Sequence, residues 1–490
     1  MKPSYDVVVI GTGMGGSAAG ALVAREGFKV LFLEKNPQIG GACSFYRKEG
    51  VHVDMGAHVF SRGNRGPIGD VQRRLGAERM ISFQRCDPMM RFKGPGFDLA
   101  GRFQSYSLPL LGAAMLKQLR LPAREILPMA RRMAEPLLVP AGSVRDLNAV
   151  NVEERLLAST REPALVLLTS IFMGLAFVIP LWEASSGEAL WSTKKAFFDR
   201  SMGYPIGGAV AVPQAFIEAA RGFGAQLETG TRVKAIRVSG CRVEGVETDR
   251  GELFSCRAVV STTSLKDTVR LAGRGCFPAP YLRHVDGIKG SLGAVQAKIL
   301  LDRRIVKEGV LVGVRDRRSA PGRPLTVEDT RKLWQDTQEG KIPELMSFYC
   351  PVPTNFDPSL APPGMQLLTL TSAAPTTDRK GGDPQDAWID AMLEGFFDIY
   401  PEARKHVVWI DRFSNRYLEQ WLGKRGGPVI STGQQTGQVG PGRHPNITPV
   451  QGLFAAGDCA GARGIGTELA CQSGIDCAEL LIQSLCNRIV

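Results

Sequence analysis

The stretch VVVIGTGMGGSAAGALVAREGFKVLFLEKN, residues Val7–Asn36, places a glycine-rich loop between an uncharged, β-branched run and an alanine-rich run. Val7–Ile10 is typical of a fully buried strand at the centre of a sheet. The alanine-rich run predicts a helix over Ser17–Glu26, which Gly27 would end, and Lys29–Leu33 predicts a second strand. This order predicts the first β–α–β unit of an α/β sheet that binds a nucleotide.

Three glycines of the loop, Gly11, Gly13 and Gly16, have the spacing G-x-G-x-x-G. The first makes a tight turn, the second lets the backbone approach a pyrophosphate, and the third lets helix and strand pack closely. The amino end of the helix offers free N–H groups and a positive dipole to the phosphates. Glu34 follows the second strand, where an acid can accept both hydroxyls of an adenosine ribose. We therefore expect a bound dinucleotide rather than a merely structural turn.

The other end of the chain favours FAD over NAD. The buried-strand pattern Gly452–Ala456 leads into Gly457–Asp458, and Thr467–Leu485 predicts a helix. A second glycine pair, Gly40–Gly41, follows Glu34, as expected for a chain that continues along an extended cofactor. A ligand that needs both ends of the chain must be long, and FAD is. The alternative is a strand–turn–helix unit that only closes the sheet.

The composition argues against several other classes of protein. The 490 residues are 44% hydrophobic, which suffices for a full-sized core in two domains. Ten scattered cysteines indicate reduced thiols and a cytoplasmic protein, and the five histidines form no ligand cluster, so no metal site is expected. A net charge of +12 suits an anionic membrane or an acidic substrate, but no nucleic-acid-binding motif accompanies it.

Pieces of the nucleotide-binding domain recur far apart along the chain. We predict an α/β fold in which a Rossmann-type FAD-binding domain is assembled from residues 1–75, 203–265 and 425–490. An inserted α+β substrate-binding domain would take residues 76–202, which look mainly helical, and residues 266–424, where helices and strands mix.

Four stretches resemble the phytoene desaturase-like branch of the flavin amine oxidase superfamily, which includes carotenoid desaturases and isomerases and relatives of retinol saturase. Besides the N-terminal loop, they are VDMGAHVF at Val53–Phe60, GYPIGGAVAVPQAFIEAA at Gly203–Ala220, and the terminal block Gly452–Leu481. The resemblance implies non-covalent FAD and an apolar isoprenoid or polyene lipid, whose carbon–carbon bonds are desaturated, saturated or isomerised. The stretch Cys459–Thr467 departs from the His-Pro-Gly-type sequence of carotenoid desaturases, which argues against phytoene itself as the substrate.

Two polar side chains are the main candidates for catalysis. His58 lies where the family's chain passes close to the flavin; it could shuttle a proton or make a structural hydrogen bond. Arg463 could meet the flavin or a polar substrate group, or lie in solvent. Glu468 is a weaker candidate because a carboxylate in a first helical turn usually only favours the dipole, and Cys459 fits a packing residue. The residues expected to bind the cofactor lie in or near the glycine-rich turns: Gly11, Gly13, Met14, Gly16, Glu34, Lys35, Gly41, Ala42, Val233, Gly457, Asp458, Gly466 and Thr467.

Several functions remain open at this point. The first is an FAD-dependent oxidoreductase that transfers hydride between an apolar lipid and flavin N5, and the second is a redox-neutral isomerase. An amine or porphyrinogen oxidase is a third, although no aromatic pair for the flavin is evident. A non-catalytic prenyl-lipid-binding protein would not need the intact glycine loop, Glu34 and Asp458. No second nucleotide fingerprint is apparent, so quinone or oxygen is the expected electron acceptor.

Two segments decide the expected relation to membranes. Pro163–Trp182 is uncharged over about 20 residues, which is long enough to span a bilayer. We expect instead a helix of the substrate domain, buried or lining an apolar tunnel, because a spanning helix would separate the two parts of the cofactor site. Leu116–Leu138 mixes basic and apolar residues, and its three prolines would break it into short helices. These helices could lie on the inner face of an anionic membrane, or form an ordinary solvated surface.

Overall fold

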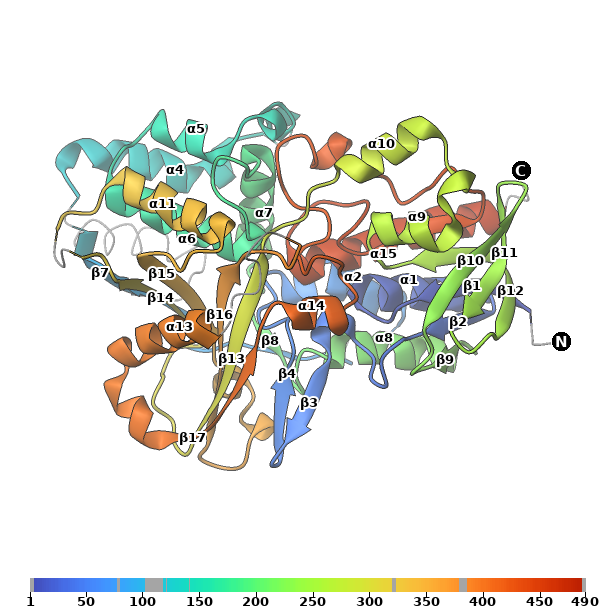
Figure 1. Ribbon diagram of the computed structural model, residues 1–490, viewed down its shortest axis with the longest axis horizontal. Helices are drawn as coiled ribbons and strands as arrows, with labels where there is room; N and C mark the ends of the chain where they lie inside the picture. Colours follow the sequence, from blue (N-terminus) through green and yellow to red (C-terminus); the bar gives the residue numbers. More distant parts are fainter. Residues whose placement is uncertain are drawn as a thin grey trace.

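The computed structural model of the chain describes residues 4–76, 80–101, 118–119, 121–140, 142–319, 323–378 and 386–486. Figure 1 shows two halves side by side, each built on its own sheet. One half holds the glycine-rich loop and the C-terminal helix, and the other is built mainly from the two inserted regions. The architecture agrees with the α/β fold predicted from the sequence.

The first sheet has the strand order β10-β11-β12-β1-β2-β9, and β18 also pairs with β12. Strands β1, β2, β9, β12 and β18 pair in parallel, whereas β10 and β11 form an antiparallel extension. The strands are β1 Tyr5–Ile10, β2 Val30–Leu33, β9 Gln226–Glu228, β10 Val233–Ser239, β11 Arg242–Thr248, β12 Leu253–Ser261 and β18 Leu453–Ala455. Strands from all three segments of the predicted FAD-binding domain thus share one sheet, while the domain boundaries stay a prediction.

Different helices cover the two faces of this sheet, because side chains alternate along each strand. Val7 and Val9 of β1 pack against α1, α8 and α15, whereas Val8 and Ile10 lie in the cluster with α9 and α10. The helices are α1 Met14–Arg25, α8 Ala211–Gly222, α9 Leu265–Ala272, α10 Ala279–Gly287 and α15 Gly466–Cys486. Burial on both faces explains why β1 is apolar throughout its central residues.

The first and last of these helices touch backbone to backbone. A Cβ added to Gly15 of α1 would lie 2.7 Å from Cα of Gly457, and a Cβ added to Gly474 of α15 would lie 2.5 Å from the carbonyl oxygen of Gly15. Only glycine permits such a close approach. The contact holds the C-terminal turn against the N-terminal loop.

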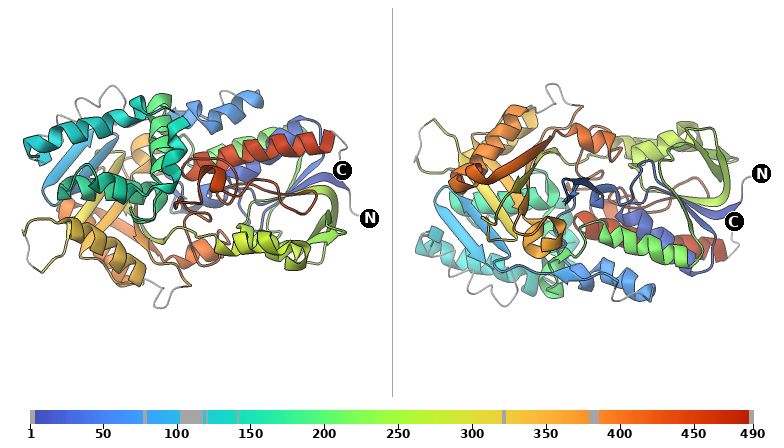
Figure 2. Two further views of the ribbon diagram at one scale, coloured as in Figure 1. Left: turned by 90° about the horizontal axis from the view of Figure 1, so that it is seen from above. Right: turned by 90° about the horizontal axis from the view of Figure 1, so that it is seen from below.

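The second sheet has the order β17-β13-β16-β15-β14-β6-β7. Helix α13 packs on one face, and α6 and α11 pack on the other; Figure 2 shows these helices from above and below. These elements are β6 Met90–Gly94, β7 Phe97–Gly101, β13 Gly293–Leu301, β14 Val310–Asp316, β15 Leu345–Pro351, β16 Gln366–Ala374, β17 Val407–Phe413, α6 Pro163–Phe177, α11 Val327–Glu339 and α13 Asp386–Ile399. The described part of residues 76–202 is mainly helical as expected, and the β6–β7 hairpin adds two strands that were not predicted.

Two short antiparallel ladders add to these sheets. β5 pairs with β8, which joins the first inserted region to the segment after it, and β3 pairs with β4. The elements not yet described are β3 Phe45–Lys48, β4 Val51–Asp54, β5 Phe83–Gln84, β8 Tyr204–Pro205, α2 Pro67–Arg74, α4 Ile126–Leu138, α5 Val152–Leu157, α7 Ser186–Asp199, α12 Pro353–Phe356 and α14 Arg416–Gln420.

The uncharged stretch Pro163–Trp182 forms the predicted helix as α6, which ends where Val178 adopts a left-handed conformation. α6 packs against α11, where the Trp334 indole N–H donates a hydrogen bond to Ser170 Oγ at 2.6 Å. Within the described residues, no helix is long and apolar enough to cross a membrane.

The basic stretch Leu116–Leu138 differs from its prediction. Its residues Lys117 and Arg120 lie outside the described part of the chain. Pro122 interrupts the stretch as predicted, because its backbone is extended, whereas Pro128 and Pro136 both lie inside one helix, α4. Pro128 does not end the helix because it lies in the first turn, where backbone N–H groups have no partner within the helix.

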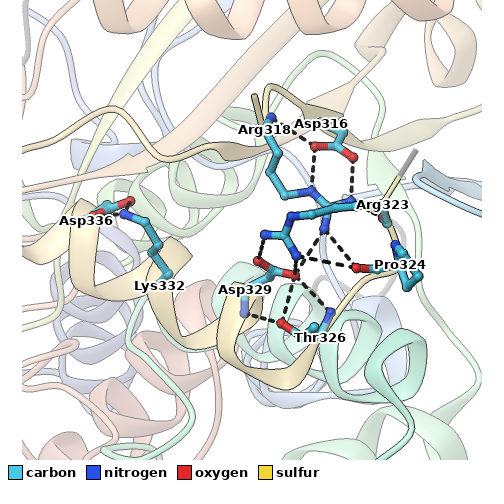
Figure 3. Close-up of polar contacts among 8 residues, drawn as sticks. All are labelled: Asp316, Arg318, Arg323, Pro324, Thr326, Asp329, Lys332 and Asp336. Carbon is cyan, nitrogen blue, oxygen red and sulfur yellow. Dashed lines mark hydrogen bonds and ion pairs between the residues drawn. The ribbon is translucent and has the colours of Figure 1, made fainter. Parts of the chain in front are cut away.

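A buried ion network anchors the start of α11 (Figure 3). The Arg318 guanidinium donates to both carboxylate oxygens of Asp316, at 2.8 and 2.7 Å, and to Asp329 at 3.0 Å. Asp329 also accepts hydrogen bonds from the backbone N–H and the hydroxyl of Thr326, which completes the capping box of α11. The network therefore ties the end of β14 to the first turn of the helix.

Candidate functional site

The glycine-rich loop between β1 and α1 forms a tight turn. Gly11 has a φ of 94°, and a Cβ added to Gly16 would overlap the carbonyl oxygen of Gly11. Helix α1 begins at Met14, and in the part of the chain that is described no side chain caps it and no acid lies in its first turn. The N–H groups of this turn are therefore available to an anion, which the helix dipole also favours.

Glu34 lies directly after β2 and is 4% exposed. Its Oε2 accepts hydrogen bonds from the Thr12 backbone N–H at 3.0 Å and from Thr12 Oγ1 at 2.7 Å, and its Oε1 accepts one from the Asn36 N–H at 3.0 Å. The fold thus brings the predicted ribose acid against the glycine-rich loop and fixes its carboxylate. Thr12 was not predicted as a site residue; its hydroxyl inside the G-x-G motif is the sequence signal for it.

Two further predicted residues lie beside the same loop. A Cβ added to Gly41 would lie 3.1 Å from Cα of Gly13, so these two backbones are neighbours. The carbonyl of Ala42 accepts a hydrogen bond from the Ala57 N–H at 2.9 Å. The segment after Glu34 therefore connects the glycine-rich loop to the chain around His58.

Lys35 and Val233 lie at the outer end of this region. Lys35 Nζ donates a hydrogen bond to the Gln420 carbonyl at 2.8 Å, and burial, together with the charge of Arg232, lowers the pKa of Lys35 to about 8. Val233 is a buried residue of β10. Contact of either residue with a cofactor stays a prediction.

The C-terminal turn follows β18. Gly457 is buried and has a φ of 105°. Asp458 Oδ2 accepts hydrogen bonds from Lys424 Nζ at 2.6 Å and from the Ser431 N–H at 2.9 Å. Burial raises the pKa of Asp458, but Lys424, the Ser431 N–H and Arg443 together outweigh it, so the pKa lies below its usual value. Gly466 and Thr467 begin α15 close to this turn.

Two open positions fit a bound FAD. A Cβ added to the buried Gly457 would meet no atom within 4 Å, and a Cβ added to Gly13 would meet only Cα of Gly41 at 4.0 Å. A Cβ added to the neighbouring Gly15 or Gly16 would instead clash with backbone atoms. The open space therefore lies only beside Gly13 and Gly457, on the face where a pyrophosphate must approach the backbone. Together with Glu34, these positions form a set of residues that suits the cofactor.

His58 is buried beside a lysine that was not predicted. Lys298 of β13 is fully buried, and its Nζ lies 3.2 Å from His58 Nε2, 3.3 Å from the Met55 carbonyl oxygen and 3.4 Å from Thr369 Oγ1. Burial lowers the pKa of Lys298 to about 7, and burial together with the Lys298 charge holds the pKa of His58 well below its usual value. The pair can therefore hold or release a proton near neutral pH.

The sequence does contain a signal for Lys298. It stands within the apolar run Gly293–Leu301, and all nine residues of that strand are buried. Lysine is almost never fully buried unless it is paired, so a lysine in such a run marks a position of interest.

Asp54 forms a second buried polar group close to Met55. Its carboxylate accepts hydrogen bonds from the Tyr204 hydroxyl and from the Ala209 N–H, and it lies 3.2 Å from His52 Nε2. Burial and the Asp54 charge raise the pKa of Tyr204 well above its usual value, so the hydroxyl stays protonated and donates. These contacts join VDMGAHVF to GYPIGGAVAVPQAFIEAA, two of the stretches that carry the family resemblance.

Arg463 is engaged by other protein groups. Its Nε donates to Glu188 Oε2 at 2.8 Å, and its Nη2 donates to Asn148 Oδ1 at 2.8 Å. Glu188 of α7 also accepts a hydrogen bond from the Gly464 N–H at 2.6 Å. The structure thus places Arg463 in a part-buried bridge between the C-terminal turn and α7, which differs from the solvated alternative.

Glu468 and Cys459 also have internal partners. Glu468 Oε1 accepts hydrogen bonds from Ser61 Oγ and from the Arg62 N–H, both at 3.0 Å, so this carboxylate holds the segment after His58. Cys459 is buried, and burial together with Asp458 raises the pKa of its thiol to about 12. A thiol with this pKa is protonated at neutral pH, as expected for a packing residue.

Comparison with known proteins identifies the family. The model of the family described as flavin containing amine oxidoreductase matches residues 15–482. A zeta-carotene-forming phytoene desaturase of Myxococcus xanthus is 26% identical over 408 residues, which cover 75% of this chain and 72% of the relative. A chloroplastic prolycopene isomerase of Arabidopsis thaliana is 22% identical over 522 residues, which cover 97% of this chain and 82% of the relative.

A solved structure shares the fold. An oxidoreductase from Methanosarcina mazei superposes with a TM-score of 0.68 at 20% identity, covering 97% of this chain and 100% of that chain. The family match spans nearly the whole chain and confirms the cofactor and the enzyme class predicted from the sequence. The chain therefore belongs to the flavin-containing amine oxidoreductase family and is an FAD-dependent oxidoreductase.

Proposed function

We propose that the enzyme desaturates or saturates carbon–carbon bonds of an apolar isoprenoid or polyene lipid. The observation that carries this proposal is the similarity to the Myxococcus xanthus phytoene desaturase over three quarters of the chain. The similarity to a prolycopene isomerase supports the same class of substrate and makes isomerisation without net redox change the second candidate.

We assign FAD to the face that the open glycines border. Gly11, Gly13, Gly16 and the first turn of α1 would bind the pyrophosphate, Glu34 the adenosine ribose, and Asp458 the flavin half through its ribityl chain. When bound, FAD supplies an acceptor for a hydride from an allylic carbon. The other residues proposed to line the site are Met14, Lys35, Gly41, Ala42, Val233, Gly457, Gly466 and Thr467.

Desaturation also removes a proton from the neighbouring carbon, and we assign that proton to Lys298 with His58. A neutral amine with a pKa of about 7 can accept a proton at physiological pH. His58, whose low pKa keeps it neutral, orients the Lys298 nitrogen at 3.2 Å. We assign Arg463 a positioning role, because its guanidinium is already bound by Glu188 and Asn148.

The apolar interior of the second half supports a lipid substrate. Val59, next to His58, packs against the same cluster as Leu168 of α6 and Val312 of β14. Helix α6 carries no charged residue along its length. An apolar chain that reached His58 from this side would therefore meet apolar side chains and exclude water from the reacting carbon.

The remaining parts of the proposal concern the electron acceptor and the location. We propose quinone or oxygen as the acceptor and a peripheral position on the inner face of a membrane, where apolar isoprenoids are stored. Amine and porphyrinogen oxidation stay alternatives, because the family contains amine oxidoreductases.

Anaerobic flavin reduction tests the proposal. The purified holoenzyme is mixed with detergent-dispersed phytoene or lycopene in one series and with putrescine or cyclohexylamine in another. The absorbance of the oxidised flavin at about 450 nm is then followed by rapid spectroscopy. We expect a desaturase to be bleached only by the polyenes and a saturase, reduced beforehand, to be re-oxidised only by them; mass spectrometry of the products and of copurified lipid then separates these reactions, which change the mass, from isomerisation, which does not. Bleaching by the amines alone would contradict the proposal.

A further inference from the structure

Helix α4 turns four large apolar side chains outward. Ile126, Leu127, Leu137 and Leu138 are 44%, 62%, 49% and 72% exposed. At 3.6 residues per turn, these four positions fall within an arc of about 120° on the helix. A surface helix ordinarily buries its large apolar residues, whereas α4 buries Met129 and Pro136 and leaves these four exposed.

The acidic residues of this region point inward. Glu135 pairs with the Arg155 guanidinium, with both hydrogen bonds at 3.0 Å. Glu125, directly before the helix, is buried and accepts a hydrogen bond from Thr160 Oγ1 at 2.5 Å. Glu135 is therefore neutralised by Arg155 on the protein side of α4, and buried Glu125 lies 3.7 Å from the Nε of Arg124.

Basic residues lie on the outer side. The Arg124 side chain is 80% exposed, and Arg131 is exposed just beyond the edge of the apolar arc, about 20° from Leu138. At the far end of the helix, Lys194 Nζ donates to the Val139 carbonyl at 2.7 Å and lies 5.9 Å from the ring of Phe198, which is itself exposed. An apolar stripe with cations at its margins, on a chain of net charge +12, matches a surface that is apolar inside and anionic outside.

We propose that α4 is the surface by which this enzyme docks on an anionic bilayer, with Ile126, Leu127, Leu137 and Leu138 inserted among the acyl chains and Arg124 and Arg131 at the phosphates. The inference rests on the proposed lipid-directed function and deepens it, because it names the surface through which a membrane-dissolved substrate is reached. The helix lies in the plane of the interface and does not span the bilayer.

Vesicle flotation with the FAD-loaded enzyme tests the docking surface. The vesicles contain either phosphatidylcholine alone or phosphatidylcholine with phosphatidylglycerol, at low and at high salt. We expect binding to the anionic vesicles that weakens as salt rises. The double variant Leu127→Glu/Leu138→Glu should lower the partition coefficient at least about tenfold, and Arg124→Gln/Arg131→Gln should lower it about fivefold for each arginine and flatten the salt dependence.

The matched control is Phe223→Glu/Leu253→Glu, which adds the same two charges at exposed apolar residues of the first half. It should float like the wild type, and every variant should keep wild-type flavin content and melting temperature. The proposal would be overturned if the wild-type protein bound no vesicles, or if the control variant lost as much vesicle binding as Leu127→Glu/Leu138→Glu. The wild type could also be a dimer that binds no vesicles and that Leu127→Glu/Leu138→Glu converts to a monomer. That result would overturn the proposal and show that α4 packs against a second copy of the chain. Flavin bleaching by detergent-dispersed polyene is measured without vesicles, so failure of the proposed function is recognised separately.

Discussion

Replacing Gly13 by alanine should separate folding from cofactor binding. Gly13 has φ and ψ of −63° and 177°, which any L-residue adopts, and the new Cβ would meet only Cα of Gly41 at 4.0 Å. The free energy of unfolding without FAD should therefore change by less than about 1 kcal/mol. The same methyl group occupies the face that a pyrophosphate must approach, so binding should lose about 1–3 kcal/mol, which raises the Kd for FAD about 5-fold to 150-fold.

The assay pairs a melting curve of the flavin-free protein with titration of FAD, followed by the fluorescence of the flavin or by calorimetry. Gly275→Ala is the matched control, because its new Cβ would meet no atom within 4 Å and would lie away from the loop. It should leave both quantities unchanged. Wild-type affinity in Gly13→Ala would refute the assignment of the pyrophosphate to this glycine, and a flavin-free protein that fails to fold would refute the steric argument.

Three further outcomes follow from buried charges. Lys424→Met should raise the Kd for FAD about tenfold, because Asp458 loses a charge-assisted hydrogen bond that fixes its carboxylate; titration of FAD checks this, and an unchanged Kd would remove Asp458 from the site. In the wild type, the pKa of Lys298 is about 7 when folded against 10.5 when unfolded, so the unfolded state binds more protons between these values and stability rises with pH across them. Urea unfolding of Lys298→Met at several pH values should lack that rise, and an identical slope in both proteins would show that the lysine is not buried uncharged. Asp329→Asn should lower the free energy of unfolding by about 2 kcal/mol, because Arg318 keeps Asp316 but loses its charged hydrogen bond to Asp329, and a loss below about 0.5 kcal/mol in denaturant unfolding would contradict the network in Figure 3.

Local patterns were sufficient for the parts of the fold whose neighbours are close in sequence. β1, α1 and β2 were predicted because an apolar run, three spaced glycines and an alanine-rich run specify them without outside help. The β6–β7 hairpin was missed because its short strands are stabilised by pairing with β14, more than 200 residues further along the chain. The continuity of α4 was missed because proline was treated as a break even in a first turn, where it is tolerated.

The candidate site divides in the same way. The glycines and Glu34 were proposed from one spaced motif, and Asp458 from the turn after a buried strand; the structure brings these segments together, and their contacts with FAD stay a prediction. Lys298 was missed because its meeting with His58 joins residues 240 positions apart, and the burial that lowers its pKa is a property of the folded sheet. The partner of Arg463 was missed for the same reason, since Glu188 lies 275 positions away.

The glycine contact between α1 and α15 has a consequence for biosynthesis. The ribosome releases α1 early, but Gly474 and the turn at Gly457 emerge only near the end of translation. Until then the glycine-rich loop lacks the wall that closes its cofactor face, and the apolar side of α1 has no α15 to cover it. We therefore expect flavin to be retained only after translation has passed α15, and a ribosome that stops earlier to produce an apoprotein with an exposed apolar helix that chaperones and proteases would recognise.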